Sequence, residues 1–153
     1  MNTFSAENNQ KAIDCLKVAV ASDPSYAEAW IQYAAVTSWA YSQRWGGGKE
    51  DLKDAANFAE KAISLDPEYG AAHAMRAEIA YYDGDWSKMY DAADKALDLS
   101  PGDPTVVGKS AWYNAFGGDC TDKEISDTFT NKDLPPTSFV SLISLAIIVG
   151  AVK

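Results

Sequence analysis

The sequence predicts an all-α fold in which short helices stack as successive antiparallel pairs. Three observations support this prediction: prolines recur at nearly constant spacing, alanine-rich segments with helical periodicity lie between them, and glycine-containing turns divide the units in two. The marking prolines Pro24, Pro67, Pro101 and Pro135 are separated by 43, 34 and 34 residues. A fixed period of this length is typical of solenoids, in which each unit buries its apolar face against its neighbours.

The first three marking prolines follow the ends of predicted helices. The segments KVAVASDP, EKAISLDP and DKALDLSP finish on Asp-Pro or Ser-Pro after an apolar helical face. Proline cannot continue a helix interior, and the residue before it avoids the α conformation. The Asp or Ser beside the proline is expected to cap the helix that follows. Within the units, DGD at Asp83–Asp85 and GGD at Gly117–Asp119 predict the turn between paired helices.

The first unit contains a longer turn than the others. Its spacing exceeds theirs by nine residues, which is the length of QRWGGGKED, Gln43–Asp51. Its glycines and Lys49 suggest a phosphate-binding loop, but that loop needs Gly, four residues and Gly-Lys-Ser/Thr between a strand and a helix. Here Gln43 stands at the first glycine position, Glu50 follows Lys49, and the preceding segment is helical. We therefore expect the glycines to end one helix, and Lys49 to Asp51 to begin the next, where acidic residues suit the helix dipole.

The packing positions resemble those of the tetratricopeptide repeat (TPR) family, whose period is about 34 residues. With each marking proline set at repeat position 32, mostly small residues fall at positions 8, 20 and 27, where the resemblance places the contacts between paired helices. These residues are Ala34, Ala77 and Ala111; Ala12, Ala55 and Met89; and Ala19, Ala62 and Ala96. The resemblance implies a right-handed superhelix of antiparallel helix pairs. It covers most of the chain and weakens after Pro101, where Lys123, Asp127 and Thr130 occupy packing positions.

We expect residues 1–153 to form one solenoid domain, because this length is typical of a single core. Its expected parts are a half repeat 4–24, a repeat 27–67 with an inserted loop 43–51, a repeat 70–101, a degenerate repeat 104–135 and a terminal helix 138–152. The segments FSAENNQKAIDCL and VASDPSYAEAW, with the lengthened first turn, are similar to repeat regions beside bacterial nucleotide-cyclase and winged-helix regulator domains. Neither of those domains is visible in this sequence.

Composition and motifs argue against several classes of function. A net charge of −9 disfavours nucleic-acid and anionic-membrane surfaces. The apolar run Phe139–Val152 has 14 residues, fewer than the ~20 that span a bilayer. The two cysteines, Cys15 and Cys120, suggest reduced thiols, and the N-terminus lacks a secretory signal, so a cytoplasmic protein is expected. The single histidine, His73, falls at a packing position. We therefore predict no enzyme, catalytic residue, metal or cofactor.

The resemblance implies a concave groove lined by the first helix of each repeat. The residues assigned to this peptide-binding groove are Trp39, Glu78, Tyr81, Tyr82, Trp112 and Phe116. Tyr and Trp give large contact areas at low entropic cost, although the same residues can simply pack between helices. Some family members bind acidic peptide tails through Lys, Arg and Asn, but Arg76 and Lys109 do not match that pattern. A protein or peptide ligand of apolar or mixed character is therefore expected.

The end of the chain suggests self-association as an alternative. The segment Ser138–Val152 has little polar face, and Phe139, Ile143 and Ile147 are the candidate contact residues for a homo-oligomer. Two other outcomes stay open: the segment folds back on its own core, or the chain is a piece of a longer solenoid. A role as an accessory region of a bacterial signalling regulator rests only on the finer resemblance.

Overall fold

A computed structural model of the chain describes residues 5–117, with side chains described up to Tyr113. These residues form six α-helices and no strand. The helices are α1 (Ala6–Ser22), α2 (Ala27–Gln43), α3 (Lys49–Leu65), α4 (Gly70–Asp83), α5 (Trp86–Leu99) and α6 (Pro104–Gly117). The second half of the expected degenerate repeat and the expected terminal helix 138–152 lie outside the described residues.

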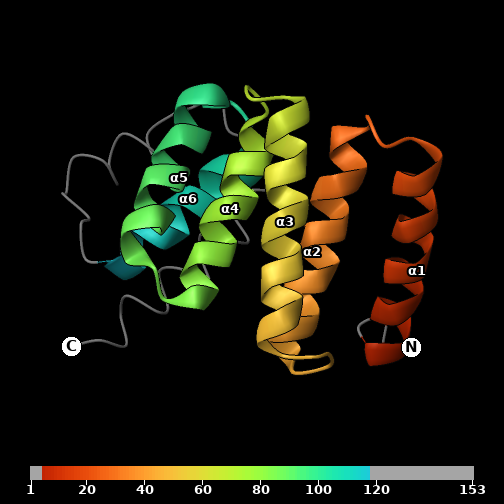
Figure 1. Ribbon diagram of the computed structural model, residues 1–153. Coiled ribbons are helices and arrows are strands. Elements are labelled where there is room, and N and C mark those ends of the chain that lie inside the picture. Colours follow the sequence, from red (N-terminus) through yellow and green to blue (C-terminus); the bar gives the residue numbers. More distant parts are fainter. Residues whose placement is uncertain (1–4, 118–153) are drawn as a thin grey trace.

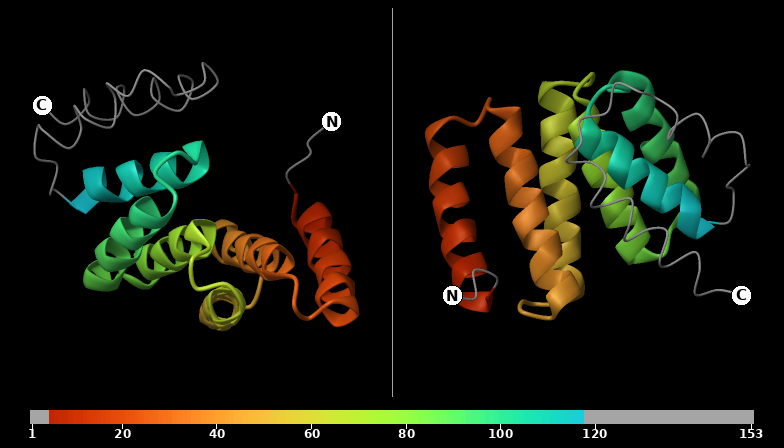
Figure 2. Two further views of the ribbon diagram at one scale, coloured as in Figure 1. Left: turned by 90° about the horizontal axis from the view of Figure 1, so that it is seen from above. Right: turned by 180° about the vertical axis from the view of Figure 1, so that it is seen from behind.

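Successive helices run antiparallel and form a curved layer (Figure 1). The closest pairs are α2 with α3 and α4 with α5, while α6 packs against both α4 and α5. Seen from above, α2 and α4 lie in the middle of the arc, α3 lies on its outer side, and α1 and α6 lie at its two ends (Figure 2). The predicted all-α superhelix of antiparallel helix pairs is confirmed.

Small side chains lie where paired helices touch. Six of the predicted packing residues are completely buried, with an exposed fraction of 0%: Ala34, Ala55, Ala62, Ala77, Met89 and Ala96. At the five alanine positions a methyl group lets two backbones approach closely, whereas Met89 is a large side chain that is also completely buried. The same positions in α1 and α6, Ala12, Ala19 and Ala111, are half-buried. The prediction is therefore confirmed most clearly for α2 to α5.

In α2 and in α4, one side chain of the first helical turn contacts the carbonyl oxygen of the marking proline that precedes the helix. Trp30 Nε1 donates a hydrogen bond to the carbonyl oxygen of Pro24 at 3.0 Å. In the next repeat His73 Nε2 lies 3.0 Å from the carbonyl oxygen of Pro67. His73 is 7% exposed, so the expectation of a buried packing histidine is confirmed. The two contacts fix the angle at which each first helix leaves its turn.

The prediction that Asp beside proline caps the following helix is wrong for two turns. Asp23 and Asp66 instead accept hydrogen bonds from the backbone N–H groups of Ser25 and Glu68, two residues further on. Such local turns are the common alternative to helix capping for Asp side chains. At the third turn the cap is not the predicted Ser100 beside Pro101 but Asp103, which accepts from the N–H groups of Thr105 and Val106 in α6.

The glycine-rich turn between α2 and α3 also differs from its prediction. The residue that ends α2 is not a glycine but Arg44, whose φ of 59° lies in the left-handed region. Gly48, with φ 80°, precedes α3, and the Asp51 carboxylate accepts a hydrogen bond from its N–H at 3.1 Å. The expectation that α3 starts at Lys49 with acidic residues in its first turn is confirmed.

We expect Gly46→Ala to lower the free energy of unfolding by ~1 kcal/mol, the typical value of a helix N-terminal cap. A Cβ at residue 46 would lie 2.2 Å from Asp51 Oδ2, so the carboxylate must leave the N–H of Gly48. The matched control is Gly47→Ala, where the nearest Asp51 oxygen lies 3.4 Å away. Urea unfolding followed by circular dichroism compares the two variants, and equal stability would exclude this role of Gly46.

Candidate binding groove

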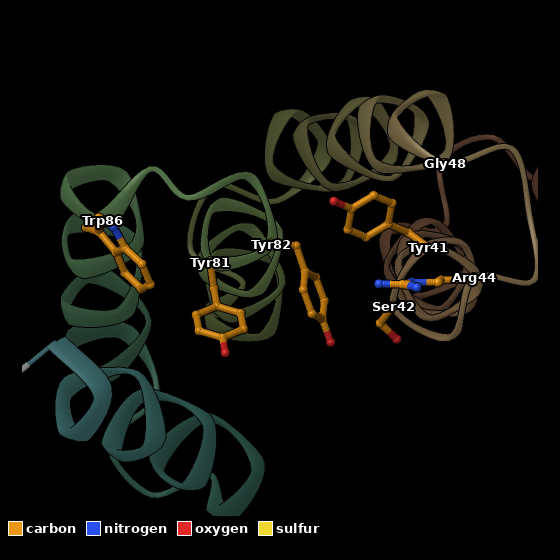
Figure 3. A pocket seen from close by; sticks show the side chains of 7 residues that line it. All are labelled: Tyr41, Ser42, Arg44, Gly48, Tyr81, Tyr82 and Trp86. Carbon is orange, nitrogen blue, oxygen red and sulfur yellow. The ribbon is translucent and has the colours of Figure 1, made fainter.

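An open groove lies between the C-terminal ends of α2 and α4. It has a volume of about 480 Å³, within the range of known ligand sites, and is flanked by the turn before α3 and the first residue of α5. The residues that line it are Tyr41, Ser42, Arg44, Gly48, Tyr81, Tyr82 and Trp86. We call this surface the aromatic groove. Figure 3 shows Tyr81 and Tyr82 at its centre, Tyr41 and Arg44 on the α2 side and Trp86 on the α5 side.

Aromatic rings form a connected cluster along the groove. Tyr81 is its centre, with ring centroids 5.5 Å from Tyr82, 5.9 Å from Trp86 and 4.9 Å from Trp112. Tyr82 extends the cluster to Tyr41 of α2, at 5.9 Å. These distances and edge-to-face angles are the favourable arrangement for aromatic pairs. The cluster therefore forms a continuous aromatic surface whose outer member, Trp86, is 50% exposed.

A polar group lies beside the aromatic cluster, between α4 and α6. The carboxylate of Glu78 accepts a hydrogen bond from Lys109 Nζ at 2.6 Å, and Ser38 Oγ of α2 lies 3.4 Å from its other oxygen.

Burial and the nearby Glu78 charge raise the pKa of Tyr113, and the same two causes raise the pKa of Tyr82. Both tyrosines therefore keep their protons at neutral pH and can donate hydrogen bonds.

The structure places the predicted groove residues in different surroundings. Tyr81 and Tyr82 line the aromatic groove. Trp112 packs on Tyr81 but does not line the groove, and Glu78 forms an ion pair with Lys109. Trp39 is 41% exposed but does not line the groove. The side chain of Phe116 and the self-association candidates lie outside the described residues; the latter are Phe139, Ile143 and Ile147.

Sequence reasoning missed several residues of the aromatic groove. Tyr41 and Arg44 stand at the end of α2, beyond the positions that the repeat register assigns to a binding face. Trp86 begins α5, the second helix of its pair, whereas the prediction considered first helices only. A usable signal was present, because Trp86 directly follows the DGD turn and so must lie beside the end of the preceding helix.

The groove does not have the features of a metal centre. Within residues 5–117 no three His, Cys, Asp or Glu side chains are arranged to hold a metal ion. The groove offers aromatic faces, hydroxyl groups and one guanidinium, which suit binding by apolar contact and hydrogen bonding. A separate finding is that none of the helices in the described part of the chain has the length and apolar character to cross a membrane.

Helix pairing, buried small residues and proline turns together define a TPR-like fold. Among solved structures, the thermophilic TPR protein TTC0263 of Thermus thermophilus is similar, with a TM-score of 0.67 at 20% identity over 90% of this chain and 78% of that chain. A chain in the structure of Naa15/Naa10 bound to HypK-THB matches 94% of this chain and 27% of its own length, at 20% identity and a TM-score of 0.49. No family model and no curated protein matches the sequence.

Proposed function

We propose that the protein is a non-catalytic scaffold that binds a protein or peptide partner through the aromatic groove. The observation that carries this proposal is the connected cluster of rings that opens to solvent between α2, α4 and α5. Exposed Trp and Tyr side chains on a rigid support are the residues that most often dominate binding energy. A partner segment would gain apolar contact without having to order the groove first.

Trp86→Ala is expected to weaken capture of the partner at least about tenfold, because a Trp that dominates a binding surface typically supplies more than ~2 kcal/mol of binding energy. The matched control is Tyr26→Ala, since Tyr26 is exposed to a similar degree, 55% against 50%, but lies at the opposite end of α2. Pull-down from cell extract with quantitative mass spectrometry compares both variants with the wild type. If proteins retained by the wild type are retained equally by Trp86→Ala, the aromatic groove is not the binding surface.

Trp86 is preferred to Trp112 and Tyr82 as the first test. Trp112 lies 4.9 Å from Tyr81 and 5.3 Å from Tyr113, and Tyr113 is only 3% exposed. Tyr82 packs against the core of α2, α3 and α4. Truncating either residue would disturb folding as well as binding. Trp86 is half-exposed, so its removal leaves the core unchanged and isolates the binding effect.

Self-association is the alternative function. The apolar α1 residue Val18 is 66% exposed, and among the described helices α1 packs substantially only against α2. Val18 could contact a second copy, although a single exposed apolar side chain is common on protein surfaces, and Phe139, Ile143 and Ile147 stay the candidate contact residues. Light scattering on the pull-down variants separates the two functions, because Trp86→Ala should change partner capture and leave the molecular mass unchanged. A role beside a bacterial regulator domain also stays a proposal.

A further inference from the structure

Arg44 occupies a backbone position that suits glycine. Its φ is 59°, and its N–H caps α2 by bonding to the carbonyl groups of Ala40 and Tyr41. The equivalent residue after α4 is Gly84, with φ 78° and its N–H on the carbonyl groups of Ala80 and Tyr81. The left-handed conformation is unfavourable for a residue with a side chain and is routine for glycine. At this position arginine thus stabilises the folded protein less than glycine would, and glycine is the residue found at the equivalent position of the next repeat.

The side chain of Arg44 lies on the wall of the aromatic groove. Figure 3 shows it extending from the α2 side of the groove toward Tyr82. No carboxylate within residues 5–117 forms an ion pair with its guanidinium, and no acceptor there takes a hydrogen bond from it. Among the other cations close to the groove, Lys109 lies 2.6 Å from Glu78 and Lys88 lies 2.6 Å from Asp85, while Lys49 is exposed beside Gly48 and does not line the groove. Arg44 is therefore the cation of this groove that is available to a ligand.

The charge balance favours a carboxylate as the group that Arg44 binds. A guanidinium presents parallel N–H donors that match the two oxygens of a carboxylate. The groove supplies one such cation, and the chain as a whole carries a net charge of −9. A singly charged carboxylate is balanced by one guanidinium, whereas a phosphate dianion would keep an excess of negative charge near an acidic protein. The adjacent rings of Tyr41 and Tyr82 suit an apolar side chain.

We propose that the aromatic groove selects a peptide segment in which an apolar residue stands beside an Asp or Glu. The apolar side chain packs against Tyr41 and Tyr82, and the carboxylate binds the guanidinium of Arg44. The groove is bounded by the end of α2 on one side and by α4 with α5 on the other (Figure 3), which suits a segment passing through it. This inference rests on the proposed peptide-binding function and adds the chemistry of the partner.

The test starts from a phage-displayed library of random dodecapeptides fused through their C-termini, so that only side chains supply carboxylates. The wild type should enrich peptides that carry Asp or Glu beside an apolar residue. The best peptide is then synthesised with blocked ends, together with its Glu→Gln or Asp→Asn form, and dissociation constants are measured by fluorescence polarisation. Loss of a hydrogen-bonded charge should weaken binding to the wild type at least about tenfold.

Arg44→Gly is the decisive variant because it removes the side chain without threatening the fold. Its melting temperature should equal or exceed that of the wild type, since glycine relieves the left-handed strain. It should bind the acidic and amide peptides equally, at the affinity of the wild type for the amide form. Arg44→Lys keeps the charge but loses the planar donor pair. Its preference for the acidic peptide over the amide peptide, measured as the ratio of the two dissociation constants, should lie between those of the wild type and Arg44→Gly.

The outcomes separate the inference from the proposed function. Enrichment of apolar peptides without acidic residues, or an acid preference that Arg44→Gly retains, would overturn the role of Arg44 and leave the groove as a binding site. No enrichment by the wild type would overturn both. A third arm uses the amide peptide with a free C-terminal carboxylate; if it binds as tightly as the acidic peptide, the chain terminus and not a side chain is the ligand.

Discussion

Ala77→Leu is expected to lower the free energy of unfolding by ~3 kcal/mol, the upper end of the usual cost of overpacking. Ala77 is 0% exposed and packs in one cluster with Met89 and Ala93 of α5 and with Tyr113 of α6. Three additional carbon atoms have no space there, so α4 and α5 must separate or neighbouring side chains must leave their preferred rotamers. The cost should be large because this contact brings two helix backbones together.

Urea unfolding followed by circular dichroism measures the loss, and an unchanged m-value would show that stability alone has altered. The matched control is Ala71→Leu in the same helix, at a half-buried position, where a change below ~0.5 kcal/mol is expected. The double variant Ala77→Leu with Met89→Ala should recover part of the loss, because the methionine that shares the cluster becomes smaller. Equal losses at residues 77 and 71 would contradict close packing of the helix pair.

The framework of helix pairs could be predicted because it depends on local spacing. Proline at the turns and alanine at the contacts are requirements of any close helix hairpin, so they recur with the period of the repeat. The completely buried Ala34, Ala55 and Ala77 follow directly from this register. The turns were harder, since an Asp side chain can cap the next helix or bond two residues on, and Asp23 and Asp66 do the latter.

The aromatic groove could be predicted only in part because it is formed between repeats. Tyr81 and Tyr82 stand at positions that the TPR resemblance assigns to the inner face, and both line the groove. Tyr41, Arg44 and Trp86 reach it from helix ends and from a second helix, at positions no repeat register marks. Whether these side chains reach the groove depends on how successive helix pairs are arranged in the folded chain, and the spacing of residues within one repeat does not determine that arrangement. The left-handed backbone of Arg44 had no sequence signal either, since that conformation is typical of glycine.

The ion pair between Glu78 and Lys109 is expected to stabilise the protein more than the other ion pair of α4. Glu78→Gln should lower the free energy of unfolding by ~2 kcal/mol, because the partly buried Lys109 loses its partner and the contact between α4 and α6 weakens. The side chains of Glu78 and Lys109 are 19% and 36% exposed. Water and salt screen the pair incompletely at this depth, so most of the loss should persist in concentrated salt.

A double-mutant cycle with Glu78→Gln and Lys109→Met isolates the pair, with an expected coupling of ~1 kcal/mol. The control is Glu60→Gln, which removes an ion pair between Glu60 and Arg76 whose side chains are 56% and 45% exposed; its effect should stay below ~0.5 kcal/mol. The comparison also decides the role of Glu78, which the sequence assigned to ligand binding. If Glu78→Gln leaves stability unchanged but weakens partner capture, its carboxylate serves the ligand; a loss of stability with unchanged capture makes it the residue that holds α6 against α4.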